Sequence, residues 1–506
     1  MTSTSSQTIG VVGAGLMGRG IVQLFAQAGH RVLCFDAQSG AATKAVDYVL
    51  GMLSRNVEKG RLSADAFEGI RANMQPCTEL ADLAVCDVVV EAIIENLDAK
   101  QQLFRSLEAV VPERTLLVSN TSSLTVADIA SACQHPQRVA GLHFFNPVPL
   151  MKVVEVIAAV RTEPGIVETL TTLVASTGHR AVVAADQPGF LVNHAGRGYY
   201  TEALRVVEEQ AATPAEVDTV MREAAGFRMG PFELLDLTGL DTSSKVMTSI
   251  YEQFQHEPRY RPSSLVPPRV SAGLFGRKTG QGWYVYDGDV KRAPAPRAVP
   301  PLPAGLAVWI DPQSPAHADV AALVSAAGGK MLDQPAPDAL LIVQPWGKDA
   351  TTAAVEQGLD ASRCVGLDPL PGFKQHRTLM LTVTTLPAMR DAALALFSSD
   401  GVTATVINDS PGFIVQRVLA TIVNIAANIA QRGIATVADL EDAVKLGLGY
   451  PHGPLAWGDR IGGERVLAIL RNMQAATGDP RYRPSPWLER RVKLGLPLLT
   501  LETPRA

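Results

Sequence analysis

The sequence lacks paired cysteines and histidine clusters, and each absence removes a class of protein. Its five cysteines form no CxxC and are odd in number, so a disulfide framework is not expected and a reducing compartment is favoured. These cysteines are Cys34, Cys77, Cys86, Cys133 and Cys364. The nine histidines form no HxxxH and no His/Cys pair at ligand spacing, so no metal site is predicted.

Neither an excess of one charge nor a long hydrophobic run is present. Lysine and arginine number 45 against 50 acidic residues, so no global attraction to nucleic acid or to an anionic membrane is expected. The N-terminal MTSTSSQT has no signal-peptide features, and no apolar run approaches the roughly 20 residues of a membrane span. We therefore expect a cytoplasmic protein that holds any anionic ligand at a local site.

Apolar residues make up 47% of the 506, enough for normal cores in about three domains of roughly 150 residues. Residues 1–185 alternate β-branched apolar runs with helical patterns, which is typical of a doubly wound, Rossmann-like α/β domain. The predicted strands are Ile9–Val12, Arg31–Phe35, Val88–Val90, Thr115–Val118, Arg138–Leu142 and Val153–Ile157. Residues 186–290 show long helical periodicity instead, so a second, all-α domain is expected.

Proline is concentrated in residues 291–304, which predicts an extended linker. The prolines that carry this prediction are Pro294, Pro296, Pro300, Pro301 and Pro303.

Beyond the linker the chain repeats itself. DQPGFLV from Asp186 recurs as DSPGFIV from Asp409, and the two stretches then align without a gap at a constant offset of 223. PRYRPS occurs twice, from Pro258 and from Pro480, and RVAGLH is echoed by RCVGLD. We therefore predict a diverged second copy of the α/β plus all-α unit, with a degenerate Rossmann-like domain over 305–408 and a second helical domain over 409–506.

The run VVGAGLMG places a GxGxxG turn between the first strand and a helical stretch. Its glycines let the backbone approach a pyrophosphate closely at the N-terminus of a helix. Asp36 ends the second strand, where its carboxylate can accept from both hydroxyls of a ribose. No Lys or Arg follows directly to pair with a 2′-phosphate, so NAD is predicted rather than NADP.

Two polar clusters follow strands of the predicted sheet. VEAIIEN contains Glu91 and Glu95, and SNTSSL contains Asn120 and Ser122. Each cluster could simply cap the helix that follows it. However, ligands of open α/β sheets bind beyond the carboxyl ends of the strands, which is where both clusters are expected.

His143 directly follows one predicted strand, and Glu155 interrupts the apolar run VVEVI of the next. A histidine flanked by Leu and Phe is often a satisfied core residue. A carboxylate within an apolar strand is costly unless it is paired, and a turn at residues 146–150 would bring it beside His143. The pair is then a candidate general base with its orienting carboxylate. Asn193, in PGFLVN, adds an amide on an apolar helical face.

These motifs, in order and at family spacing, resemble those of L-3-hydroxyacyl-CoA dehydrogenases over the first 287 residues, and the whole chain resembles the long bacterial form associated with phenylacetate and β-oxidation-type catabolism. The resemblance implies that His143 is the catalytic base, Glu155 its partner, and Ser122 and Asn193 hydrogen-bonding groups at the reacting oxygen. The residues it implies for NAD binding are Gly13, Gly15, Leu16, Met17, Gly18, Asp36, Glu95, Lys100 and Asn120. For CoA it implies Lys59 with Ser122 and Asn193, although Met52 stands where the family has a serine.

The reaction implied by this resemblance is the NAD-dependent oxidation of an (S)-3-hydroxyacyl-CoA to the 3-oxoacyl-CoA, with 3-hydroxyadipyl-CoA or 3-hydroxybutyryl-CoA as candidate substrates. One alternative is a 3-hydroxyacid dehydrogenase of the 6-phosphogluconate dehydrogenase type, but such enzymes use a lysine where Gly189–Tyr200 has none. The other is an inactive NAD- or CoA-binding scaffold, against which the intact His143 and Glu155 argue.

The second copy is predicted to be catalytically silent. The repeat alignment replaces His143 by Asp368, Glu155 by Met380 and Asn193 by Gln416, and no GxGxxG follows Gly305–Ile310. In single-unit members of the family the helical domain is the dimer contact, so the two helical copies are expected to pair within one chain as a pseudo-dimer or between chains as a homodimer.

Overall fold

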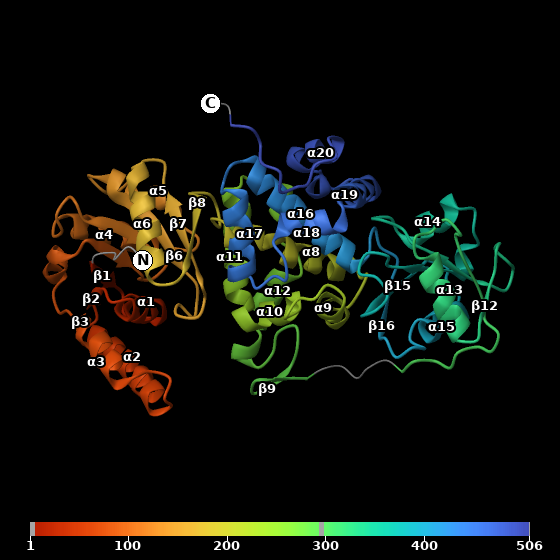
Figure 1. Cartoon of the computed structure of the whole chain (residues 1–506), viewed down its shortest axis with the longest axis horizontal. Helices are drawn as coiled ribbons and strands as arrows, with labels where there is room; N and C mark the ends of the chain where they lie inside the picture. The colour runs from red at the N-terminus through yellow and green to blue at the C-terminus, as the bar shows by residue number, and fades with distance from the viewer. Residues whose placement is uncertain (1–5, 293–297, 505–506) are drawn as a thin grey trace. The chain divides into compact units, whose positions relative to one another are not determined.

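A computed structural model of the chain describes residues 6–292 and 298–504. The chain divides into two compact units, which Figure 1 draws in the colours of the sequence. The first comprises residues 1–194 together with 432–448, and the second comprises 195–431 together with 449–506. A short segment of the second copy is therefore part of the same compact unit as the predicted NAD domain.

The first unit is built on one eight-stranded sheet of order β3-β2-β1-β4-β5-β6-β7-β8. All neighbouring strands are parallel except β6 and β7, which pair antiparallel. The strands are β1 Thr8–Val12, β2 Arg31–Phe35, β3 Met74–Pro76, β4 Val88–Glu91, β5 Leu116–Ser119, β6 Val139–Phe144, β7 Val153–Ala158 and β8 Arg180–Ala185. The six strands expected from the sequence are confirmed; β3 and β8 were not foreseen.

Helices bury both faces of this sheet. Val88 and Val90 belong to one hydrophobic cluster and Val89 to another, because successive strand residues point to opposite faces. The helices of the domain are α1 Leu16–Gln27, α2 Ala41–Glu58, α3 Ala64–Ala72, α4 Leu97–Glu108, α5 Val126–Ala130 and α6 Pro164–Ser176. The doubly wound α/β prediction is therefore confirmed, and the topology places the carboxyl ends of the parallel strands on one edge.

The first helical copy consists of short helices closed by the segment that contains GRKTGQGWY. Its helices are α7 Val192–Ala195, α8 Arg197–Glu208, α9 Pro214–Glu223, α10 Pro231–Thr238, α11 Leu240–Gln253 and α12 Val266–Ser271, followed by the hairpin β9 Tyr286–Asp287 and β10 Val290–Lys291. The Asp236 carboxylate accepts hydrogen bonds from the backbone of Trp283 and Tyr284. Two of the motifs behind the family resemblance therefore hold this domain closed.

The second copy opens with a smaller sheet, of order β12-β11-β13-β14-β15-β16, with helices α13 to α15 around it (Figure 1). Its elements are β11 Ala307–Ile310, α13 His317–Ala326, β12 Lys330–Met331, β13 Leu340–Val343, α14 Ala350–Glu356, β14 Cys364–Leu367, β15 Arg377–Leu381, α15 Pro387–Leu396 and β16 Ala404–Ile407. Of the linker before it, residues 298–303 form no helix or strand, whereas 293–297, with Pro294 and Pro296, lie outside the described residues.

A shared contact fixes the correspondence between the two sheets. Asp186 accepts from the first amides of α5, and its repeat partner Asp409 accepts from those of α14. Strand β13 therefore corresponds to β5, and the described part of the second copy has no counterpart of α2, α3, β3, β4 or α4.

The register corrects one position of the repeat alignment. In the first sheet His143 faces Glu155 and Gly141 faces Ile157. In the second, Gly366 faces Met380, and the Asp368 amide donates to the Thr378 carbonyl. The counterpart of Glu155 is therefore Thr378, and the prediction of Met380 was wrong, because ten positions separate Asp368 from its strand partner whereas twelve separate His143 from Glu155.

The two helical copies pack on each other within the second unit. The second copy contributes α16 Ile414–Gln431, α18 Pro454–Ile461, α19 Gly463–Thr477 and α20 Pro486–Lys493 to this unit. Helix α16 lies against α8, and a Cβ on Gly198 would lie 3.1 Å from the Ile422 amide nitrogen, so the glycine permits the close approach. The expectation of an intrachain pseudo-dimer of helical copies agrees with this packing.

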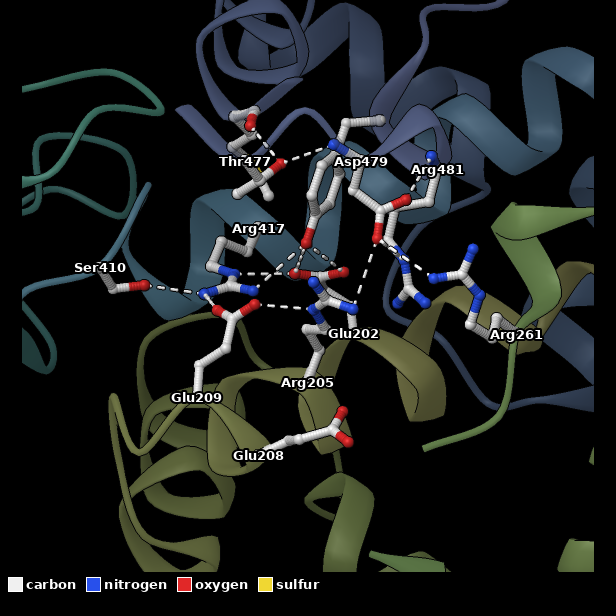
Figure 2. Close-up of polar contacts among 12 residues, drawn as sticks. Glu202, Arg205, Glu208, Glu209, Arg261, Ser410, Arg417, Thr477, Asp479 and Arg481 are labelled. Carbon is white, nitrogen blue, oxygen red and sulfur yellow. Dashed lines mark hydrogen bonds and ion pairs between the residues drawn. The ribbon is translucent and has the colours of Figure 1, made fainter. Parts of the chain in front are cut away.

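A buried charged network crosses this contact between the helical copies. Arg417 of α16 donates to Glu202 of α8 at 2.7 Å, and both side chains are at most 1% exposed. Figure 2 shows Arg417 held between Glu202 and Glu209. The Tyr482 hydroxyl also donates to Glu202 at 3.0 Å. The repeated PRYRPS motif lies at the same contact, since its two copies form the adjoining short helices Pro258–Tyr260 and Pro480–Tyr482.

Helix α16 is the one described helix long and apolar enough to span a membrane, and 83% of it is buried within the protein. With 18 residues it approaches the length of a membrane span, which was not predicted, and its burial is that of a core helix.

Candidate active site

The glycine turn after β1 has the geometry of a phosphate cradle. Gly13 adopts a φ of 101°, and a Cβ on it would lie 2.6 Å from the Ala92 carbonyl oxygen. A Cβ on Gly18 would lie 1.7 Å from the Gly13 carbonyl oxygen, so neither position accepts a larger residue. Gly15 borders open space and caps α1 without a side-chain hydrogen bond, which leaves the first amides of that helix for an anion.

Asp36 lies at the end of β2, beside this turn. Its carboxylate accepts from the Ala14 amide at 2.7 Å and from the Gln38 amide at 2.8 Å. These contacts fix the carboxylate next to the cradle, where it can accept from a ribose and repel a 2′-phosphate. Leu16, which begins α1, is an exposed apolar residue at the same place, and Met17 is half-buried. The donor set therefore fits NAD.

His143 and Glu155 face each other on the antiparallel strands β6 and β7. His143 Nδ1 lies 2.5 Å from Glu155 Oε2, and both side chains are nearly inaccessible to solvent. The other carboxylate oxygen, Oε1, accepts from the backbone amides of Leu191 and Val192 at 2.9 and 2.7 Å. The free-energy cost of burying the Glu155 carboxylate is thus offset by contacts with one imidazole and two backbone amides.

The contact with Glu155 determines what the imidazole can do. A carboxylate only accepts hydrogen bonds, so Nδ1 carries the hydrogen and Nε2 keeps its lone pair. The rings of Phe145 and Phe190 lie 4.4 and 5.9 Å from the imidazole centroid and limit its movement. His143 is therefore an oriented base whose protonated form would be stabilised by an adjacent carboxylate.

The loop that follows β5 is organised by Glu95. Its Oε1 accepts from the Thr121 hydroxyl at 2.6 Å and from the amides of Ser122 and Ser123 at 3.0 Å each. Burial raises the pKa of Glu95, but the ammonium of Lys100 and these hydrogen bonds lower it by more, so the net pKa shift is downward. The loop is thereby ordered with Ser122 half-buried within it.

Glu91 and Lys100 form a buried ion pair beneath this loop. Lys100 Nζ lies 2.6 Å from Glu91 and 3.3 Å from Glu95, and the lysine is only 1% exposed. Glu91 also accepts from the Ser119 hydroxyl. Lys100 thus reaches the predicted cofactor region through Glu95. The sequence offered one signal for this core, a glutamate directly after the run VVV.

Of the remaining predicted residues, Asn120 and Asn193 lie near the pair of His143 and Glu155, whereas Lys59 does not. The Asn120 side-chain oxygen accepts from the Phe144 amide at 2.8 Å, which ties the β5 loop to the residue after His143. Asn193 follows Val192, whose amide binds Glu155. Helix α7 begins at Val192, so Asn193 is the second residue of this helix. Lys59 is exposed at the C-cap of α2 and is not brought into the catalytic cluster.

Comparison with known proteins identifies the family of this chain and its cofactor. The model of the 3-hydroxyacyl-CoA dehydrogenase NAD-binding domain matches residues 8–187, and the model of the C-terminal domain of that family matches residues 189–286 and again 412–498. The chain belongs to the 3-hydroxyacyl-CoA dehydrogenase family. It is an NAD-dependent oxidoreductase of 3-hydroxyacyl-CoA esters, and the second C-terminal match confirms the duplicated helical domain.

Full-length and half-length relatives both occur. The dehydrogenase is 37% identical to a 3-hydroxyadipyl-CoA dehydrogenase of Escherichia coli K12, over 96% of this chain and 98% of the relative. It is 38% identical to the mitochondrial hydroxyacyl-coenzyme A dehydrogenase of Sus scrofa, over 54% of this chain and 90% of the relative. A crystal structure of a 3-hydroxybutyryl-CoA dehydrogenase from Escherichia coli K12 superimposes with a TM-score of 0.84 at 35% identity, covering 97% and 99% of the two chains.

The second copy of the dehydrogenase has lost the corresponding groups. His143 and Glu155 are replaced by Asp368 and Thr378, and Gln416, which replaces Asn193, donates to Asp368 at 2.9 Å. Through the match of β13 with β5, Trp346 takes the place of Ser122. The turn after β11 contains Asp311-Pro312 in place of a glycine cradle.

Proposed function

We propose that this dehydrogenase oxidises an (S)-3-hydroxyacyl-CoA to the 3-oxoacyl-CoA with His143 as the general base. The contact between His143 and the buried Glu155 carries the proposal, because it leaves an imidazole nitrogen free to accept a proton. Bound NAD⁺ supplies the acceptor for the hydride that leaves C3.

The chain's own residues would then act on the substrate oxygen. His143 Nε2 takes the proton of the C3 hydroxyl while the C–H electron pair leaves as hydride, so that the C–O bond becomes a carbonyl. Glu155 stabilises the imidazolium through the Nδ1 hydrogen. Ser122 and Asn193 donate to the same oxygen and fix its direction, and Lys59 is the candidate contact for the CoA phosphates.

Replacement of the base tests this proposal. We expect His143→Gln to lower kcat by at least about a thousandfold, since glutamine cannot take the proton. The Kd for NADH should stay within about twofold, because the glycine turn and Asp36 follow β1 and β2, whereas His143 lies on β6. Turnover would be followed by NADH absorbance with acetoacetyl-CoA and binding by calorimetry. Near-normal turnover would exclude His143 as the base.

We further propose a dicarboxylyl substrate such as 3-hydroxyadipyl-CoA, on the basis of the name of a full-length relative. The 3-hydroxybutyryl-CoA named for the superimposed crystal structure is the competing candidate. A kcat/KM series over C4, C6, C8 and adipyl 3-hydroxyacyl-CoA esters separates them. An adipyl ester no better than its monocarboxylate counterpart would remove the support for a dicarboxylyl substrate.

We also propose a cellular compartment and an oligomeric state for the enzyme. All five cysteines are free thiols and four of them are buried, which fits the reducing cytoplasm. Because α8 and α16 already occupy each other's apolar faces, the proposed state in solution is a single chain with an internal pseudo-dimer, without nucleic acid or membrane partners.

A further inference from the structure

Helix α17, Val437–Gly447, belongs to the second copy by sequence but packs on β7 and β8 of the catalytic sheet. Residues 432–448 form part of the first compact unit, which also contains His143, Glu155 and Asn193. The contact between α17 and the catalytic residues is therefore internal to one unit.

Two contacts attach residues 432–434 of this segment to the end of β8 and the residues that follow it. The Ala185 amide donates to the Ile434 carbonyl at 2.8 Å, and Arg432 donates to the Gln187 side chain at 3.0 Å. Residues 185–187 lead into the loop that presents Leu191 and Val192 to Glu155. The segment therefore anchors the beginning of that loop.

A pair of carboxylates clamps α17 to the start of β8. Arg180 donates to Asp439 at 2.7 Å and to Asp442 at 3.0 Å. The Arg180 side chain is 39% exposed, so the contact is partly shielded from solvent. This clamp fixes both the position and the direction of the helix along the sheet.

Gly447, the last residue of α17, lies against Val192, whose backbone amide binds Glu155. A Cβ on Gly447 would lie 3.0 Å from both γ-carbons of Val192 and 3.4 Å from a γ-carbon of Val153. The Val192 amide is one of the two that bind Glu155, and Asn193 is its neighbour. The absence of a side chain at 447 thus determines how closely Val192 can approach α17.

An equivalent joint connects the second sheet with the helical domain of the first copy, but it lacks these details. Its equivalent backbone bond, from the Asn408 amide to the Ala211 carbonyl, is 2.9 Å long. At the offset of 223, however, Thr403 replaces Arg180, Thr219 replaces Asp442, and Ala224 replaces Gly447. Glu216 keeps the carboxylate of Asp439 at this joint, but among the described residues the arginine and the glycine are found only at the joint beside the catalytic site.

We propose that α17 of the otherwise silent second copy is a positioning element of the active site, with Gly447 and Arg180 setting the placement of Val192, and through it of Glu155 and Asn193. The inference rests on the roles proposed above for those two residues. It makes the duplication a requirement for full turnover.

A matched pair of variants tests the glycine. Gly447→Val should push Val192 away and lower kcat by at least about tenfold, because small misplacements of reacting groups cost large factors in rate. The Kd for NADH should remain within about twofold, since the cofactor turn lies on β1, five strands from β8 in the sheet. Ala224→Val adds a larger side chain at the equivalent position of the first copy, next to the second, silent sheet, and should leave kcat within about twofold.

The clamp provides a second, surface-accessible test. Arg180→Met should lower kcat about three- to tenfold with the Kd for NADH retained, and Arg180→Lys, which keeps the charge, should recover part of the loss. Unchanged kcat in both Gly447→Val and Arg180→Met would overturn the proposal. An equal loss in Ala224→Val, or a parallel loss of NADH binding, would reduce α17 to a general structural role and overturn it as well.

These outcomes are separable from those of the proposed chemistry. If His143→Gln is inactive and Gly447→Val is normal, the base assignment stands and the positioning role fails. If His143→Gln keeps its turnover, the assignment of His143 as the base fails. The kcat of Gly447→Val should then equal that of Ala224→Val, because the expected loss rests on the proposed role of the His143–Glu155 pair.

Discussion

Asp368 occupies the strand position in the second copy that His143 holds in the first. It is 1% exposed and accepts from the Leu370 amide and from Gln416, while its Oδ2 has no hydrogen-bond partner among the described residues. Burial raises the pKa of Asp368 to about 7, although both hydrogen bonds act to lower it. The residue that replaced the base is thus a carboxyl group that the fold prefers to keep protonated.

This raised pKa predicts a dependence of stability on pH. Because the folded pKa exceeds the unfolded one, the folded state holds the extra proton between about pH 4 and 7, and the stabilisation is lost as the pH rises through 7. Between pH 5 and 8 the wild type should lose about 2 to 3 kcal/mol more free energy of unfolding than Asp368→Asn, which does not titrate. Urea unfolding at both pH values measures the difference. Parallel losses in the two proteins would show that Asp368 does not titrate in this range.

At the scale of elements, β4, α4 and the β5 loop are joined through one buried cation. Lys100 on α4 binds Glu91 at the end of β4 and Glu95, which in turn holds the loop carrying Ser122. The described part of the second copy lacks counterparts of β4 and α4 and also lacks the loop sequence. The joint absence has a physical reason. If one of these three elements were missing, the other two would keep a buried charge or a polar group without its partner.

Removal of that cation should be costly. Lys100→Met leaves Glu91 buried without its counter-charge, and we expect the free energy of unfolding to fall by about 3 to 5 kcal/mol. The double variant Lys100→Met with Glu91→Gln removes both charges and should recover much of the loss. Urea unfolding provides the measurement. A single variant as stable as the double one would mean that the pair is not energetically coupled.

At the scale of the whole molecule, the buried pair of Arg417 and Glu202 makes the two helical copies unequal partners. By the repeat offset, Arg417 corresponds to His194 and Glu202 to Ile425, so each copy supplies one half of the pair. Pairing of second copies with each other would bring Arg417 against Ile425 and leave its charge buried alone. Pairing of unlike copies is thereby favoured.

Because Arg417 and Glu202 are both buried, removing one of them should change the free energy of unfolding measurably. Arg417→Met should lower the free energy of unfolding by about 3 to 5 kcal/mol, because Glu202 would remain buried with only the Tyr482 hydroxyl as a partner across the contact. Adding Glu202→Leu should restore most of that stability. Urea unfolding of the single and double variants decides the matter, and equal midpoints would contradict the expected coupling.

The duplicated chain should bind one cofactor. The second sheet has no glycine cradle and no counterpart of the β4 region, so a calorimetric titration with NADH is expected to give one site per chain. Gly18→Ala is the matched control, since its Cβ would overlap the Gly13 carbonyl and should abolish that single site. Two comparable sites in the wild type would overturn the prediction.

Deletion of residues 301–506 should have two consequences. It would expose the apolar face of α8 that α16 covers, causing aggregation or forced dimerisation. It would also remove α17 from the catalytic sheet. A soluble, fully active monomer from this truncation would show that the second copy is dispensable.

The sequence by itself determined the doubly wound sheet, the glycine turn with Asp36, the pairing of His143 with Glu155 and the duplication, because each is written in local periodicity or in the cost of one misplaced polar residue. It could not determine β3 or β8, which are short or weakly patterned, nor the true counterpart of Glu155, which depends on the length of a turn. Only the tertiary structure placed α17 on the catalytic sheet, Lys100 under the β5 loop and Arg417 against Glu202. Those contacts join residues far apart in the chain, and their energies come from burial and pairing in three dimensions.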